Sequence, residues 1–170
     1  MSRIMRWSCG LLTLIVALII VGLQVERVSA ATCTTCTSTP PTAAMEQAYK
    51  GQQQRLAAIN TALTYEEHAR VSSVHELISK LQASGKSTSG LEQALKTFLD
   101  QIAIARAEWQ LASTALTTHA GFSTDGKVTD PGVARTTLYA AGGHLEQAYH
   151  IANAARDALY HAVAPYLKAG

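Results

Sequence analysis

Six histidines are the side chains best suited to metal or acid–base chemistry: His68, His75, His119, His144, His150 and His161. A carboxylate-bridged metal bundle needs Glu-x-x-His pairs on two helices, and a zinc protease needs His-Glu-x-x-His on one. No histidine here has a glutamate three residues before it, and His75-Glu76 is followed by Leu77, Ile78 and Ser79. We therefore predict that the histidines lie at the surface or rim of the fold and form no metal site.

Tyrosine and histidine also gather in the last predicted helix. They are Tyr139, Tyr149, His150, Tyr160 and His161, and all of them lie off the apolar positions of that helix. Such an edge has two interpretations: a binding surface, or the flank of a contact between helices. A ligand- or metal-binding bundle that uses this edge is the alternative to the leading hypothesis given below.

Cys33 and Cys36 form a Cys-x-x-Cys pair, while the third cysteine, Cys9, lies in the N-terminal segment. Haem attachment needs His after the second cysteine, and position 37 is Thr. A second cysteine pair that would complete a zinc site is absent from the sequence, and the pair lies in a flexible leader and not at the helix N-terminus that a redox thiol needs. We expect a local disulfide, with an intermolecular link as the alternative.

Signatures of catalysis are missing from the sequence. It contains no Gly-x-Ser-x-Gly, phosphate loop or dinucleotide fingerprint. An EF-hand alignment on Gly126 places Gly121 at the first ligand position and Gly132 where the bidentate glutamate belongs. We predict a protein that is not an enzyme and has no cofactor.

The N-terminus has the pattern of an export signal. Arg3 and Arg6 precede an apolar run over 10–23, and Val28-Ser29-Ala30 provides small residues for cleavage after Ala30. We predict a signal peptide over 1–30, with an uncleaved anchor as the alternative, and an extracytoplasmic location. Residues 31–42 are rich in Thr, Ser and Pro and should form a flexible leader, with Thr42 as the N-cap of the first helix.

The charge balance limits the class of partner. Residues 1–30 contain three of the 14 Lys and Arg residues and one of the 12 Asp and Glu residues, so the remainder has a formal net charge of zero. Without a basic cluster, neither nucleic acid nor an anionic membrane is an expected partner. A protein partner or self-association is expected, and membrane contact only through an uncleaved N-terminal segment.

The positions of apolar residues predict the elements that carry these side chains. In residues 91–116 they alternate in steps of four and three, as in a helical heptad seam: Leu91, Leu95, Phe98, Ile102, Ala105, Trp109, Ala112 and Leu116. Similar seams occupy the segments before and after it, and the last one is rich in alanine. Helices are predicted over about 43–82, 90–118 and 131–164.

Local signals mark the ends of these helices. Ser89 and Glu92 resemble a capping box, Asp130-Pro131 is a strong helix start, and Pro165 should end the last helix or kink its last turn. Short connections favour antiparallel neighbours. We predict an all-α, antiparallel up-down-up bundle of three long helices over 43–170. The leading hypothesis is an exported, non-enzymatic envelope or secreted protein that acts through partner binding, self-association or a chaperone-like surface.

Overall fold

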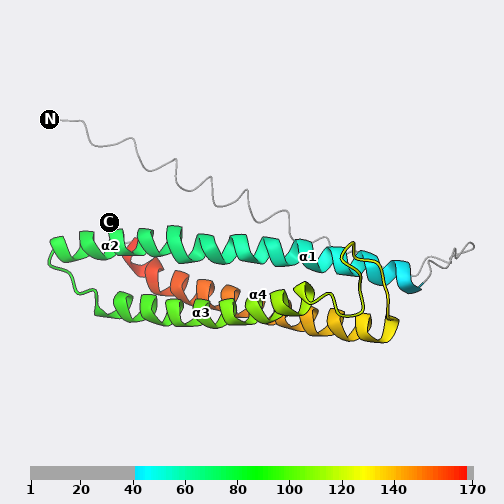
Figure 1. The fold of residues 1–170 in the computed structure, drawn as a ribbon. Helices are drawn as coiled ribbons and strands as arrows, with labels where there is room; N and C mark the ends of the chain where they lie inside the picture. Colours follow the sequence, from blue (N-terminus) through cyan, green and yellow to red (C-terminus); the bar gives the residue numbers. More distant parts are fainter. Residues whose placement is uncertain (1–40, 168–170) are drawn as a thin grey trace, which may run out of the picture. The chain divides into compact units, whose positions relative to one another are not determined.

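The computed structural model describes residues 41–167, and these form an all-α bundle of three long helices, which confirms the predicted fold class (Figure 1). The predicted signal peptide, most of the leader and the Cys33–Cys36 pair lie outside the described residues. Among the residues that are described, no helix is both long and apolar enough to cross a membrane.

The first long helix has 43 residues and three parts. They are α1 (Pro41–Tyr65), a five-residue π-helical turn (Glu66–Arg70) and α2 (Val71–Ala83). The chain reverses and continues as α3 (Ser89–Thr117), then reverses again into α4 (Pro131–Leu167). Figure 1 shows α3 running antiparallel to both neighbours in the sequence.

Three of the predicted boundaries are wrong. Thr42 is not an N-cap, because α1 already includes Pro41, and proline is well tolerated in the first turn of a helix. The N-cap of α3 is Thr88, one residue before the predicted Ser89, and its hydroxyl donates to the Glu92 carboxylate at 2.8 Å and not to the backbone. Pro165 does not end α4, which continues to Leu167 because a proline this close to a helix end removes only one hydrogen bond.

The apolar seam of α3 forms the centre of the core. Every predicted seam residue of this helix except Trp109 is at most 4% exposed. Trp109 is only partly buried because its indole N–H donates to the carbonyl of Leu56 in α1, at 2.8 Å. The seam thus packs on both neighbouring helices, as its periodicity predicted.

Alanines line the contact between α3 and α4, the most extensive helix pair in the bundle. Ala134, Ala141, Ala148 and Ala155 recur every seven residues along α4 and are between 0 and 5% exposed. Opposite them, α3 contributes its own buried alanines, Ala105 and Ala112. Methyl side chains let two helix axes approach closely, which leaves the other side of α4 facing away from the core.

The connection between α3 and α4 closes one end of the bundle. Phe122 and Val128 pair across the turn at Asp125-Gly126, and the Phe122 ring stacks on Tyr49 of α1 with the ring centroids 4.2 Å apart. Both rings are at most 5% exposed. The loop therefore covers this end of the core. The predicted N-cap of α4 is confirmed, because Asp130 accepts hydrogen bonds from the backbone N–H groups of Gly132 and Val133.

Candidate functional site

The five residues of the predicted Tyr/His edge all lie at the surface of α4. Tyr139 is 77% exposed, Tyr160 61% and Tyr149 47%, and His150 and His161 are exposed as well. Large aromatic side chains left in water are uncommon on a helix whose other side is packed with alanine. Their exposure leaves a large part of each ring accessible to a partner.

Two of the tyrosines form the same local unit with the histidine that follows each of them. Tyr149 and His150 meet edge to face with ring centroids 5.8 Å apart, and Tyr160 and His161 do so at 5.9 Å. The second pair follows the first by eleven residues, which is close to three helical turns. The two units therefore present nearly the same direction, about 16 Å apart along the helix.

The same eleven-residue interval separates Tyr139 from His150, so Tyr139, His150 and His161 form one row. This row faces away from the buried alanines, and Tyr149 and Tyr160 form a second row beside it, toward α1. The predicted edge is thus two parallel rows on the solvent side of α4. We call this surface the outer face of α4, and it also includes Glu146, Asn153 and Asp157.

Sequence reasoning missed the acidic residues of the outer face. Glu146 lies four residues before His150, and Asp157 lies four residues before His161. The Glu146 carboxylate is 3.6 Å from Nε2 of His150, and both side chains are 69% exposed. Asp157, 67% exposed, lies 3.5 Å from the Arg156 guanidinium. Ion pairs this exposed contribute little to stability, so these groups can exchange partners at little cost.

The remaining histidines occupy other positions. His68 and His75 are exposed on the first long helix. His144 is half-buried, with Nδ1 2.7 Å from the Glu108 carboxylate of α3. His119 is also half-buried and follows α3 with a positive φ of 51°, the left-handed region that non-glycine residues rarely adopt.

His119 belongs to a polar contact that sequence reasoning did not identify. The Tyr49 hydroxyl donates to the carbonyl of Leu116 at 2.8 Å and lies 2.6 Å from Nδ1 of His119. Tyr49 is only 1% exposed, and this burial raises the pKa of its phenol. Glu46, one turn earlier, pairs with Lys127 of the loop, and this hydrogen bond lowers the pKa of the Glu46 carboxyl.

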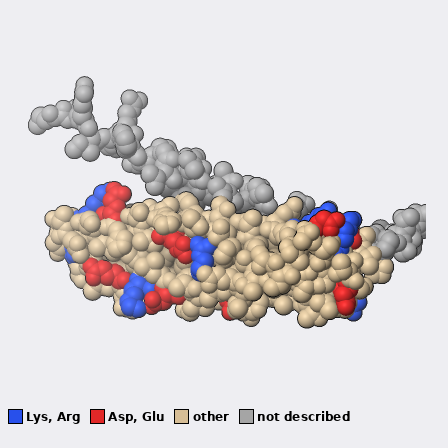
Figure 2. Space-filling model, viewed as in Figure 1, with Lys and Arg blue, Asp and Glu red and all other residues tan. Residues whose placement is uncertain are grey.

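Most charged side chains of the bundle already have partners within it. Glu66 and Arg70, four residues apart, form an ion pair across the π-helical turn. Arg106 of α3 binds both carboxylate oxygens of Glu67, at 3.2 and 2.7 Å, and also contacts Asn60 at 2.6 Å. Figure 2 shows the consequence on one face of the molecule, where the few acidic and basic groups adjoin and uncharged surface dominates.

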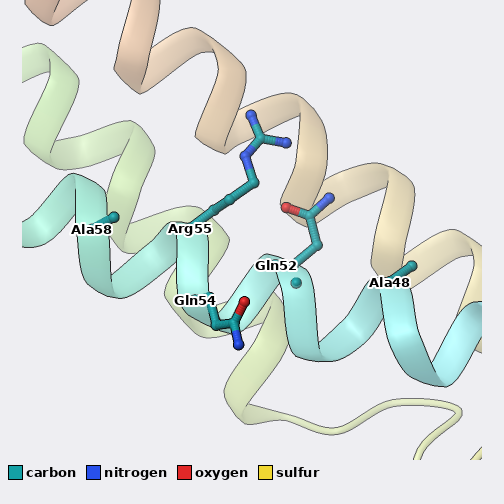
Figure 3. A pocket seen from close by; sticks show the side chains of 6 residues that line it. Ala48, Gln52, Gln54, Arg55 and Ala58 are labelled. Atoms are coloured by element: carbon teal, nitrogen blue, oxygen red, sulfur yellow. The ribbon is translucent and has the colours of Figure 1, made fainter. Parts of the chain in front are cut away.

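A shallow hollow on α1 lacks the chemistry of a binding pocket. It is lined by Ala48, Gly51, Gln52, Gln54, Arg55 and Ala58, and Figure 3 shows Gln52 and Arg55 pointing toward α4. The hollow is open to solvent and small residues form most of its floor. Gln52 fills the space over Gly142, where an added Cβ would lie 2.9 Å from its amide nitrogen.

No group of three or more His, Cys, Asp or Glu side chains within residues 41–167 could together hold a metal ion. Comparisons of the chain with protein-family models, curated proteins and solved structures found no match. The function is therefore inferred from the geometry of this chain, and above all from the outer face of α4.

Proposed function

We propose that this chain is an exported, non-enzymatic binding protein that recognises a protein partner through the outer face of α4. The observation that carries the proposal is the exposure of three tyrosines on one helix, 47 to 77%, while the alanines of the same helix are buried in its contact with α3. The export and extracytoplasmic parts of the proposal depend on the N-terminal sequence alone.

The chemistry of this face suits a protein partner. Tyrosine is enriched at protein interfaces because it offers a large apolar ring, a polar hydroxyl and few rotatable bonds. Between the tyrosines lie Glu146, His150 and Asp157, which can donate or accept hydrogen bonds around an aromatic centre. The face carries two carboxylates and no Lys or Arg, which disfavours nucleic acid and anionic lipid.

A rigid support is the second argument for this assignment. The alanines behind the outer face are at most 5% exposed, so α4 cannot easily shift or rotate against α3. A surface held in this way loses little conformational entropy when a partner binds.

Photo-crosslinking tests the proposal with a matched control. A benzophenone amino acid replaces Tyr160, 61% exposed on α4, or Tyr65, 60% exposed on the first long helix, in cells that express the full chain. We expect discrete protein adducts from position 160 and none above background from position 65. Equal labelling at both positions, or no adducts at position 160, would contradict the assignment.

Native mass spectrometry addresses the alternative, a metal- or ligand-binding bundle that uses the same Tyr/His face. The full chain is measured with and without a chelator, together with its visible absorbance. A mass equal to that of the protein alone agrees with the proposed function. A metal or chromophore bound at nearly one per chain would instead favour the alternative.

A further inference from the structure

The order of charged residues on the outer face of α4 is self-complementary when two copies run antiparallel. Along the helix the outer face presents Glu146, His150, Asp157 and His161, which is acid, histidine, acid, histidine. Their spacing is symmetric about the point between Asn153 and Ala154. When a second copy of the helix lies antiparallel beside the first with these midpoints aligned, each acid lies opposite a histidine of the other copy.

We propose that the partner of the outer face is a second copy of this chain, packed antiparallel across α4 with its two-fold axis between Asn153 and Ala154. This proposal rests on the proposed function, and it names the occupant of the surface. In this arrangement Glu146 faces the partner's His161, and His150 faces the partner's Asp157. Because a two-fold interface repeats every contact, four acid–histidine pairs form in each dimer.

The tyrosines fit the same arrangement. Tyr149 and Tyr160 lie on one flank of the outer face, and a two-fold axis between the helices places this flank beside the same flank of the partner. With the axis between Asn153 and Ala154, Tyr149 and the partner's Tyr160 differ in height along the helix by only about 3 Å. Aromatic pairs at such an offset favour stacked or edge-to-face contact.

The groups required for these pairs are available in the single chain. Glu146, His150 and Asp157 are each more than two-thirds exposed, and their contacts within the helix are single exposed pairs. A neutral or protonated imidazole can donate an N–H to a carboxylate, so the pairing does not depend on one protonation state. Asn153 and Ala154 at the centre are small enough for the two helices to approach.

Each copy contributes only one helix to this interface, so the buried area is small and the expected affinity is low. The interface falls at the low end of specific interfaces, which implies a dissociation constant on the order of 10–100 µM. Sedimentation equilibrium of the full chain, in reducing agent and from about 5 µM to about 1 mM, should show a monomer–dimer equilibrium in this range. A monomer throughout this range overturns the proposal.

Exchanging the charges tests the antiparallel arrangement. His150→Glu places a carboxylate opposite the partner's Asp157 at two symmetric positions, and it should weaken the dimer by at least about tenfold. The double variant His150→Glu with Asp157→Lys restores opposite charges across the interface. Its dissociation constant should return to within about threefold of that of the unmodified chain. His75→Glu, at an exposed histidine on α2, is the control and should leave dimerisation unchanged.

The other outcomes are informative as well. Circular dichroism should show the same helicity for all variants, which separates a lost interface from a lost fold. The direct acid–histidine pairing is overturned if His150→Glu leaves the dissociation constant of the dimer unchanged. It is also overturned if the dimer dissociates when EDTA is added. If the chain stays monomeric while position 160 still crosslinks to a different protein, this inference fails and the proposed function stands.

Discussion

The Tyr49 hydroxyl lies 2.6 Å from Nδ1 of His119, a residue 70 positions later in the chain, and it donates to the Leu116 carbonyl at 2.8 Å. This contact joins the start of α1 to the end of α3. His119 directly follows the C-cap of α3, the position at which helices commonly end in a left-handed residue, and its φ is 51°. Strain of this kind persists only where surrounding contacts hold it, and the buried Tyr49 ring provides one such contact.

Tyr49→Phe should lower the free energy of unfolding by about 1–2 kcal/mol, because it keeps the stacked ring and removes the hydroxyl from two buried polar partners. Urea unfolding of the full chain measures the change. Tyr65→Phe is the control, since Tyr65 is 60% exposed and its loss should change stability by less than about 0.5 kcal/mol. Equal effects of the two substitutions would show that the Tyr49 hydroxyl makes no net contribution.

Alkaline pH should weaken the same end of the bundle. Burial raises the pKa of Tyr49 above its ordinary value of 10.0, so the folded state holds this proton more tightly than the unfolded state does. The resulting stability is fully present below the unfolded-state pKa and is lost as pH rises through the folded-state pKa. Urea unfolding should show that the free energy of unfolding declines between about pH 8 and 11, and that this decline is smaller in Tyr49→Phe. An identical decline in both proteins would exclude Tyr49 as its source.

The two adjacent glycines in α4 should respond differently to alanine. Gly143 has no neighbour within 4 Å of an added Cβ, so Gly143→Ala should raise stability by about 1 kcal/mol through helix propensity alone. At Gly142 the added Cβ would lie 2.9 Å from Nε2 of Gln52, which must move first. Thermal unfolding should therefore show a clear gain for Gly143→Ala and a smaller gain or a loss for Gly142→Ala. The reverse order would mean that Gln52 does not occupy this space.

Arg106→Ala should destabilise the bundle by about 2 kcal/mol, because it leaves the Glu67 carboxylate without its bidentate partner at a site where both side chains are largely shielded. The side chains of Arg106 and Glu67 are 20% and 31% exposed. Lys96→Ala, which breaks an ion pair with Asp100 at 68% and 60% exposure, should cost less than about 0.5 kcal/mol. Chemical unfolding measures the free energy of unfolding of both variants. Similar losses in the two would contradict the idea that shielding from solvent strengthens the Arg106–Glu67 pair.

The periodicity of apolar residues determined the fold class without further information. Seven of the eight predicted seam residues of α3 are buried, because a 3.6-residue helix places positions spaced by three and four on one side. Asp130 was also assigned correctly, since helix capping depends on backbone groups two and three residues further along the chain. The ends of α1 and α4 were less certain because proline is tolerated in the first and last turns of a helix.

Only the tertiary structure decided which distant side chains meet. Nothing local pairs Tyr49 with His119, or Arg106 with Glu67, because these contacts depend on how far one helix is shifted and rotated against the next. The alanine contact with α3 likewise determines how α4 is rotated, and therefore which of its side chains face solvent. The sequence names Tyr149, His150, Tyr160 and His161, but only this packing shows that they face solvent together with Glu146 and Asp157, which gives the outer face its self-complementary order.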